Sequence, residues 1–241
     1  MVRAVCCFFC VVLMLHVSGC AAYTAAQPQT RAVLIDPGHG GFDGGTVATD
    51  GTNEKHINLS ISLLLRDLLA VCGVKVDLTR DTDVALEDAS AASIREKKVS
   101  DMRNRLTMYD SADLVISIHQ NHFSVAKYHG TQVFYSDNHH DSQLLATTIR
   151  ASVIRRLQPE NKRELKKAND GIYLLHHTMV PTVLVECGFL SNKEEEAKLM
   201  QEIYRQEVAR SIVQGVVDWQ ALEIEKPKAL EAVDRSGEER E

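Results

Sequence analysis

Four residues of this chain carry the groups needed for metal-assisted hydrolysis: His39, Glu54, His119 and Glu186. Two imidazoles and one carboxylate are a common protein set for catalytic zinc, and they leave one coordination position for water. Bound zinc lowers the pKa of that water to about 7. A further carboxylate, outside the metal's ligands, can accept a proton and return it to the leaving group. Glu186 suits this role because it follows an apolar run. Burial of that run would partly bury the Glu186 carboxyl group and raise the pKa of that group.

Taken one at a time, these residues also have structural interpretations. A histidine after a strand is more often a hydrogen-bonded structural residue than a ligand, and Glu54 could simply favour the start of a helix. No compact H-E-x-x-H helix joins His39 and His119, which are eighty positions apart. Glu186 is harder to explain without a function, because a carboxylate that ends an apolar strand needs a partner.

Short apolar strands alternating with helices must position these residues. His39, His119 and Glu186 each come at the end of a predicted strand or just after it. Because ligands bind beyond the carboxyl ends of the strands in open α/β sheets, we expect the three side chains to meet there. The alternation predicts one α/β domain with a mostly parallel sheet covered on both faces. Strands are expected at 31–36, 74–79, 113–118, 130–135 and 182–185, and helices at 55–72, 100–109, 142–157 and 193–222, with 84–92 ambiguous.

The composition is that of an ordinary globular protein. A chain of 241 residues with 44% hydrophobic residues can bury one good core, and a second full domain would be cramped. The formal net charge of -6 provides no global basic field, so we expect no nucleic-acid partner. Beyond residue 20 the chain contains two cysteines, Cys72 and Cys187. Both lie in apolar contexts and are expected to be buried free thiols.

The first twenty residues differ from the rest. Arg3 precedes an apolar run at 4–17, which has the length of a secretory signal and is short for a membrane span. The V-S-G-C sequence that ends at Cys20 resembles a lipoprotein processing site, and both lipidation and simple cleavage remain open. We expect export to the extracytoplasmic face of the membrane or to the cell wall, with membrane association through this leader. The predicted organisation is a leader at 1–20, a tether at 21–30, a catalytic domain at 31–222 and a charged disordered tail at 223–241.

Five segments, in order, carry a resemblance to a known family. They are VLIDPGHGGFDGG (33–45), Asn53-Glu54-Lys55, LTRDTD (78–83), ADLVISIH (112–119) and VPTVLVECGFLSNKEE (180–195). Together they resemble the zinc-dependent N-acetylmuramoyl-L-alanine amidases of the amidase type 3 family, over about residues 31–222. The resemblance implies a sheet of about six strands, and one zinc ion bound by His39, Glu54 and His119 with Glu186 as the catalytic carboxylate. It also implies that the substrate is peptidoglycan, cut between N-acetylmuramic acid and L-alanine.

Within this family, residues 161–175 look most like the germination-specific spore-cortex branch. In that branch a partner enzyme forms muramic lactam after the peptide is removed, so cortex maturation or germination is an expected setting. Two alternatives remain open. One is a degenerate amidase that binds peptidoglycan without turnover, and the other is a different cell-wall zinc hydrolase such as a deacetylase.

Further polar residues are candidates for contact with the substrate. Asn121 and His122 follow His119, and His176 and His177 precede the last strand. We expect these four residues to bind substrate, although packing or surface roles are equally compatible with the sequence.

Two other pairs of residues are expected to have surface roles. His139 and His140 resemble a solvated helix cap, and Arg103 and Arg105 are expected to form surface ion pairs. A basic run could hold the anionic stem peptide if it lies near the cleft: Arg155, Arg156, Lys162, Arg163, Lys166 and Lys167.

Overall fold

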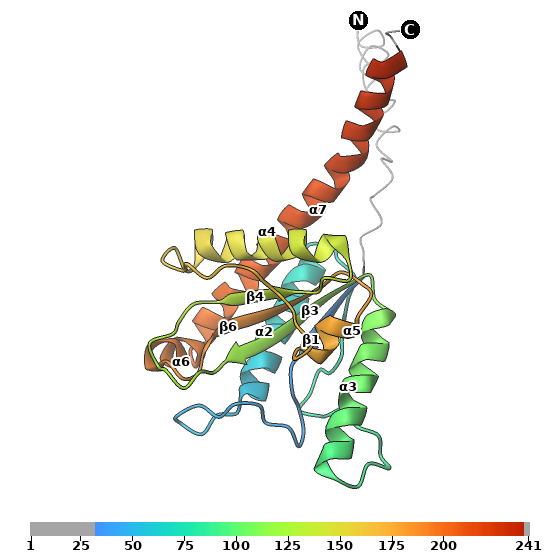
Figure 1. Cartoon of the computed structure of the whole chain (residues 1–241). Helices are drawn as coiled ribbons and strands as arrows, with labels where there is room; N and C mark the ends of the chain where they lie inside the picture. Colours follow the sequence, from blue (N-terminus) through green and yellow to red (C-terminus); the bar gives the residue numbers. More distant parts are fainter. Residues whose placement is uncertain (1–31, 239–241) are drawn as a thin grey trace, which may run out of the picture. The chain divides into compact units, whose positions relative to one another are not determined.

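A six-stranded sheet with the order β2-β1-β3-β6-β4-β5 forms the centre of the structure, a computed structural model that describes residues 32–238 (Figure 1). The strand count agrees with the expected fold. The fifth strand is only two residues long and was not predicted. The strands are β1 (Val33–Pro37), β2 (Val76–Leu78), β3 (Leu114–Asn121), β4 (Gln132–Tyr135), β5 (Lys166–Lys167) and β6 (Thr182–Phe189).

The sheet is mostly parallel, as predicted, with one antiparallel pair. β1 pairs in parallel with β2 and β3, and β3 pairs in parallel with β6. β4 runs antiparallel to β6. The connection from β3 to β4, residues 122–131, contains no helix. A parallel return needs a longer crossover, so the chain re-enters the sheet from the end at which it left and runs in the opposite direction.

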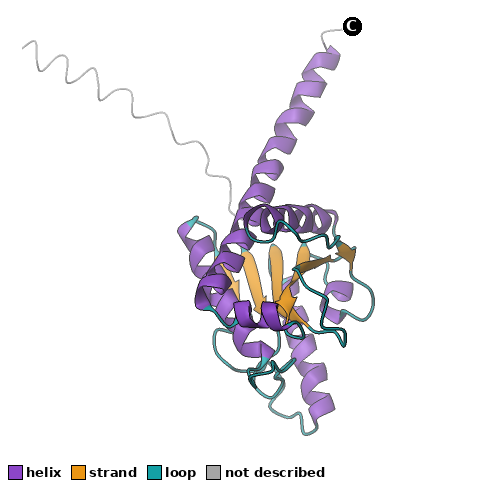
Figure 2. Ribbon diagram, turned by 90° about the vertical axis from the view of Figure 1, so that its left-hand side faces the viewer, coloured by secondary structure: helices purple, strands orange, loops and turns teal. Residues whose placement is uncertain are grey.

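Helices cover both faces of the sheet (Figure 2). Alternate strand residues such as Ile35, Ile116 and Val185 form the main core, and the helices that contact this face include α2 (Glu54–Val71), α4 (His140–Arg156) and α7 (Glu202–Glu238). Residues of the opposite parity, such as Leu34 and Val115, pack with side chains of α3 (Ile94–Asp110) and α5 (Tyr173–His177). Alternation of side chains along each strand therefore separates two apolar layers.

The helix that carries Glu54 begins and ends where its sequence requires. Ile57, Ile61, Leu65 and Leu69 recur at a spacing of four residues and are all buried. This row anchors α2 against the sheet. Gly73 then adopts φ 79°, a left-handed conformation that ends the helix and lets Val74 take the next buried position. Cys72 is therefore exposed, and the expectation that it is buried was wrong.

Helix α3 is longer than predicted, because its capping signal lies seven residues before the predicted start at residue 100. Ser93 accepts a hydrogen bond from the Glu96 backbone, and the Glu96 side chain accepts one from the Ser93 backbone. This capping box starts the helix at Ile94, not near residue 100. The preceding residues 84–92 form a loop, which is fastened to α3 where Asp101 accepts a 2.7 Å hydrogen bond from the Leu86 amide.

The carboxyl-terminal segment differs from prediction in two ways. The single helix expected at 193–222 is divided into α6 (Lys193–Leu199) and α7 by a turn at Met200. The segment from 223, expected to be disordered, continues α7 as helix to Glu238. Good helix formers such as Glu, Lys, Ala and Leu predominate there, and a helix that has nucleated upstream continues through them despite Pro227, which removes one backbone hydrogen bond. The leader, the tether and Cys20 lie outside the described residues. Within 32–238, no helix is both long and apolar enough to cross a bilayer.

Candidate metal centre and active site

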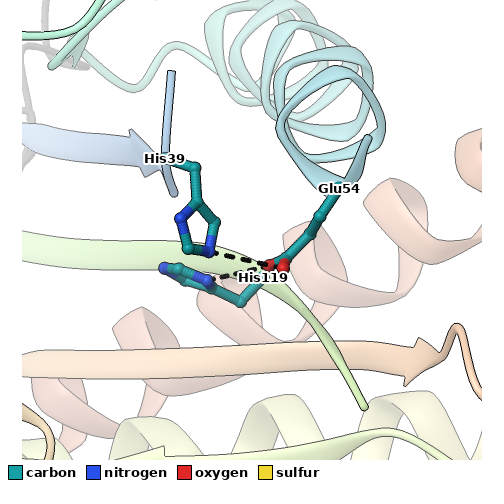
Figure 3. A group of neighbouring side chains, drawn as sticks. All are labelled: His39, Glu54 and His119. Atoms are coloured by element: carbon teal, nitrogen blue, oxygen red, sulfur yellow. Dashed lines mark hydrogen bonds and ion pairs between the residues drawn. The ribbon is translucent and has the colours of Figure 1, made fainter. Parts of the chain in front are cut away.

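Three side chains from distant parts of the sequence converge at the carboxyl ends of β1 and β3 (Figure 3). His39 follows β1, Glu54 is the first residue of α2, and His119 belongs to β3. The Nε2 atom of His39 lies 3.3 Å from Oε2 of Glu54, and Nδ1 of His119 lies 3.0 Å from Oε1 of Glu54. One donor atom from each residue falls within 4.8 Å of the others. The three residues could therefore hold one metal ion.

Asp43 sets the orientation of the His39 ring. His39 has a left-handed backbone with φ 62°, and its Nδ1 lies 2.9 Å from Oδ2 of Asp43. Holding Nδ1 in this way leaves Nε2 directed at Glu54, as expected of the outer partner of a metal ligand. Burial alone would lower the pKa of His39. The hydrogen bonds to Asp43 and Glu54 outweigh burial and raise that pKa to about 9.

Two glycines make room for the ligand side chains. A Cβ atom on Gly38 would lie 2.1 Å from Nε2 of His119, so the His119 ring packs directly on the Gly38 backbone. This contact faces Nε2 toward the P-G-H loop and leaves Nδ1 for Glu54. A Cβ atom on Gly45 would lie 2.6 Å from Oε2 of Glu54. Glycine is needed at these two positions of the first motif because the backbone there lies in direct contact with the His119 and Glu54 side chains.

The Glu54 carboxylate is buried and held by several donors. It accepts hydrogen bonds from the backbone amides of Thr46 at 2.9 Å and Gln120 at 3.0 Å, and from the Asn58 side chain at 3.2 Å. Burial would raise its pKa, but the hydrogen bonds and charges of the two histidines hold the pKa well below its usual range. The carboxylate is therefore kept ionised, which is the form that binds a cation.

Two buried arginines hold the backbone of the loop that carries His39. Arg80 donates to the carbonyl oxygens of Pro37 at 2.9 Å, Gly38 at 3.0 Å and His39 at 2.7 Å. Arg105 donates to the same His39 carbonyl at 2.7 Å. These charged donors satisfy three successive carbonyls and restrict the loop to one conformation. The expected surface role of Arg105 was wrong, because its side chain is only 1% exposed.

Asp36 supplies the counter-charge for this arginine pair. Its carboxylate contacts Arg105 and accepts hydrogen bonds from Thr79 at 2.6 Å, Tyr109 at 2.6 Å and Ser117 at 3.0 Å. Burial works to raise the pKa of Asp36, yet Arg105 and the hydroxyl groups bring it down to about 2. Asp36, Asp43 and Arg80 were not singled out from the sequence. All three lie inside the motifs at 33–45 and 78–83, which was the available signal.

Glu186 lies beside the three-residue group, as the strand pattern predicted. It pairs in register with His119 across β3 and β6, and paired residues of neighbouring strands project from the same face. Its Oε2 atom is buried and has no hydrogen-bond partner. Burial raises the pKa of this carboxyl to about 7. A half-buried carboxylate with one unsatisfied oxygen, next to a candidate metal group, is available for proton transfer.

The predicted substrate residues divide into two groups. Asn121 ends β3 and His122 is exposed just after it, so both lie close in the chain to His119. His176 and His177 lie in α5, and Asn138 donates to the carbonyl oxygens of His176 and Thr178. This places them by the amino end of β6, whereas Glu186 lies toward its carboxyl end. The structure therefore does not bring these two histidines to the metal group.

Two other sequence interpretations can be compared with the structure. His139 is the N-cap residue of α4 and accepts a hydrogen bond from the Asp141 amide, as a helix cap should. Cys187 is buried, and burial raises the pKa of its thiol well above the usual range, which agrees with a packing role.

The donor set fits a zinc ion. Two imidazole nitrogens and one carboxylate oxygen are presented together, one histidine is fixed through its second nitrogen, and the glycine contacts leave no room for bulkier side chains around them. These candidate ligands come from a strand, a helix terminus and a loop whose carbonyl groups are held by Arg80 and Arg105, so their positions are restricted. The neighbouring Glu186 takes no part in this donor group.

Comparisons with known proteins agree with this chemistry. The family model for N-acetylmuramoyl-L-alanine amidases matches residues 33–218. The germination-specific N-acetylmuramoyl-L-alanine amidase of Bacillus subtilis is 34% identical over 189 residues, which cover 78% of this chain and 78% of that protein. The Escherichia coli amidase AmiA is 26% identical over 231 residues, which cover 78% and 76% of the two chains.

A solved structure extends the agreement to the fold. The CwlD amidase from Clostridioides difficile, determined in complex with the GerS lipoprotein, has a TM-score of 0.77 and 37% sequence identity. The match covers 80% of this chain and 100% of that one. The resemblance noted from five sequence segments is thereby confirmed, and the chain belongs to the N-acetylmuramoyl-L-alanine amidase family of cell-wall enzymes.

Proposed function

We propose that this chain uses one zinc ion, bound by His39, Glu54 and His119, to hydrolyse the amide bond between N-acetylmuramic acid and L-alanine in peptidoglycan. The observation that carries the proposal is the position of Glu186. Glu186 is half-buried, its Oε2 atom has no hydrogen-bond partner, and it pairs in register with one of the three clustered side chains that could bind a metal. A structural metal site would not need such a carboxylate, whereas hydrolysis needs a group that moves a proton.

The roles of the residues follow from their positions. Zinc, when bound, supplies a Lewis acid for the amide carbonyl and makes water more acidic. Glu186 accepts the proton of the attacking water at its free Oε2 and delivers it to the alanine nitrogen as the C–N bond breaks. Asp43 keeps His39 in the orientation and tautomer that present Nε2. Asn121 and His122, at the end of β3, are positioned to contact the sugar or the peptide beside that bond.

The setting in the cell follows from the relatives. Cell-wall amidases act outside the cytoplasm, so we infer that this chain is exported through residues 1–20, either with a lipid on Cys20 or after simple cleavage. Both the Bacillus subtilis relative and the resemblance of residues 161–175 support a role in spore-cortex maturation or germination. The Clostridioides difficile relative was solved with a lipoprotein, which supports a protein partner for this chain. An enzyme that forms muramic lactam is a second expected partner.

Product analysis tests the activity directly. The purified chain is incubated with peptidoglycan, with and without a chelator, and the products are identified by mass spectrometry. We expect free stem peptides that begin with L-alanine, which disappear on chelation and return when zinc is added. Deacetylated glycan would assign the metal centre to another cell-wall hydrolase. Binding to peptidoglycan with no product, even at full zinc occupancy, would indicate a degenerate amidase.

A further inference from the structure

The carboxyl edge of the sheet carries a cationic group that the proposed reaction does not use. The basic residues at 155–167 fall into two groups in the structure, those with a carboxylate partner and those without one. Arg155 pairs with Asp218 and Lys167 pairs with Asp137, both at 3.0 Å, so these two charges are compensated. Among residues 32–222, whose side chains the structure describes, no carboxylate lies within ion-pair distance of Arg163, and Arg163 is only partly exposed. The charge of Glu195 attracts this guanidinium from a distance, but the two oxygens of Glu195 accept hydrogen bonds from the Gly130 and Phe189 amides. A partly buried guanidinium without a direct ion pair is a candidate for binding an anion from outside the chain.

Arg163 is held in a fixed position. Its guanidinium lies 4.3 Å from the centre of the Phe189 ring, a cation–π contact. Its Nε donates a 2.7 Å hydrogen bond to the His129 carbonyl, and Nη1 lies 3.4 Å from Oε1 of Gln132. These contacts leave the Nη2 group without an acceptor among the described residues. Arginine can offer such free donors to a carboxylate in a planar, bidentate arrangement.

A row of side chains connects Arg163 to the metal group. His119 pairs with Glu186 across β3 and β6, and Glu186 pairs with Gln132 across β6 and β4. Paired residues share a face, so the three side chains form one line, which Gln132 continues to Arg163. Gln132 lies one strand spacing, about 4.8 Å, from Glu186, and its side chain reaches to within 3.4 Å of Arg163, so Arg163 lies on the order of 10 Å from Glu186. An extended peptide covers that distance in about three residues.

Arg163 also lines an open cleft of about 630 Å³ with more cationic than anionic character. Lys127 and Lys162 contribute two further positive charges, and Glu160 contributes one negative charge. Tyr128 stands beside Arg163, with its ring centre 5.8 Å from the guanidinium. A net positive cleft with an aromatic wall suits an anionic peptide better than an uncharged glycan.

We propose that Arg163, with Lys127 and Lys162, forms a subsite for a free carboxylate on the second or third residue of the stem peptide. The inference rests on the proposed amidase reaction, because it assumes that the scissile bond lies between Glu186 and the metal group. In peptidoglycan the lactyl carboxyl of muramic acid is consumed in that bond, so the remaining carboxylates belong to the peptide. Arg163 is thus a specificity residue that favours peptides with free carboxylates over amidated ones.

The test compares two substrates and three variants of the full chain. The substrates are N-acetylmuramoyl tripeptides of L-alanine, D-glutamate and diaminopimelate, with the free carboxylates either unmodified or amidated. For Arg163→Gln we expect an approximately tenfold higher KM on the unmodified substrate, equivalent to about 1.4 kcal/mol, and less than a twofold change on the amidated one. The kcat should be unchanged on both. Arg163→Lys should recover part of the KM, and Arg155→Gln should match the wild-type chain.

Two results would overturn the subsite. One is an unchanged KM of Arg163→Gln on the unmodified substrate, and the other is an equal loss on both substrates, as a merely structural Arg163 would give. Failure of the amidase reaction itself is recognised separately, since the wild-type chain would then release no peptide from either substrate. In that case calorimetry with the free tripeptide still decides the subsite. Tighter binding of the unmodified tripeptide to the wild-type chain than to Arg163→Gln supports it, and equal binding refutes it.

Discussion

Arg105 donates a 2.7 Å hydrogen bond to the carbonyl oxygen of His39 from a position that is almost fully buried. The same guanidinium contacts Asp36, so a single charged side chain links the core of the sheet to the loop that presents a candidate metal ligand. Arg80 donates a second hydrogen bond, also of 2.7 Å, to the same carbonyl oxygen. The geometry of the metal centre therefore depends on groups that do not themselves contact the ion.

Replacing Arg105 should destabilise the fold far more than replacing its neighbour Arg103. Arg105→Met leaves the buried Asp36 carboxylate without its counter-ion, and we expect a loss of about 3–5 kcal/mol in the free energy of unfolding. Arg103→Met removes an ion pair with Asp88 at the surface, which is worth less than about 1 kcal/mol. Urea unfolding in the presence of a chelator measures both. Similar losses for the two variants would contradict the structural role given to Arg105.

Asp36 should make stability depend on pH in the acid range. Its pKa falls from 3.8 to about 2 on folding. The folded state therefore favours the ionised form, and the associated stability is present above pH 3.8 and is lost as the pH falls toward 2. A shift of this size corresponds to about 2 kcal/mol. We would measure the free energy of unfolding against pH for the wild-type chain and for Asp36→Asn, both without metal. As the pH falls, this free energy should decrease more steeply for the wild type. Parallel curves would exclude this contribution.

Glu186→Gln should separate catalysis from metal binding. The change keeps the size of the side chain and removes its ability to carry a proton, so we expect kcat to fall by about 10²–10⁴-fold. The zinc content, measured by mass spectrometry of the metal, should stay at one ion per chain. Glu202→Gln, an exposed substitution on α7, serves as the control and should retain full activity. Loss of zinc from Glu186→Gln would instead make Glu186 a ligand.

Gly38→Ala should weaken metal binding although it replaces none of the candidate metal-binding residues. The new Cβ would overlap the His119 ring, with Nε2 only 2.1 Å away, so the ring must move from its place beside Glu54. We expect at least a tenfold loss of zinc affinity in competition with a chromophoric chelator. Gly171→Ala is the matched control, because the nearest atom to its Cβ would be a side-chain oxygen at 3.1 Å. Normal zinc affinity in Gly38→Ala would show that His119 can bind from another position.

The sequence by itself determined the α/β alternation and the residues that meet at the sheet edge. Apolar runs ending in His119 and Glu186 could be recognised locally, because strand burial and strand ends depend on neighbouring residues. The order of motifs identified the family. The exposed Cys72, the early start of α3 at Ser93 and the separation of α6 from α7 were missed, because each depends on a turn or a cap of only a few residues.

Tertiary structure alone decided which charges are compensated and which remain free. Arg105, Arg155 and Arg163 are alike in sequence, yet Arg105 is buried against Asp36, Arg155 pairs with Asp218, and Arg163 lines a cleft whose charges are mostly positive. The partners of the first two lie 69 and 63 positions away, a separation that no local pattern encodes. The position of α5, which carries His176 and His177 by the amino end of β6, has the same origin. The electrostatics of a side chain are set by the groups that surround it in space, and those are assembled only when the sheet and its helices pack together.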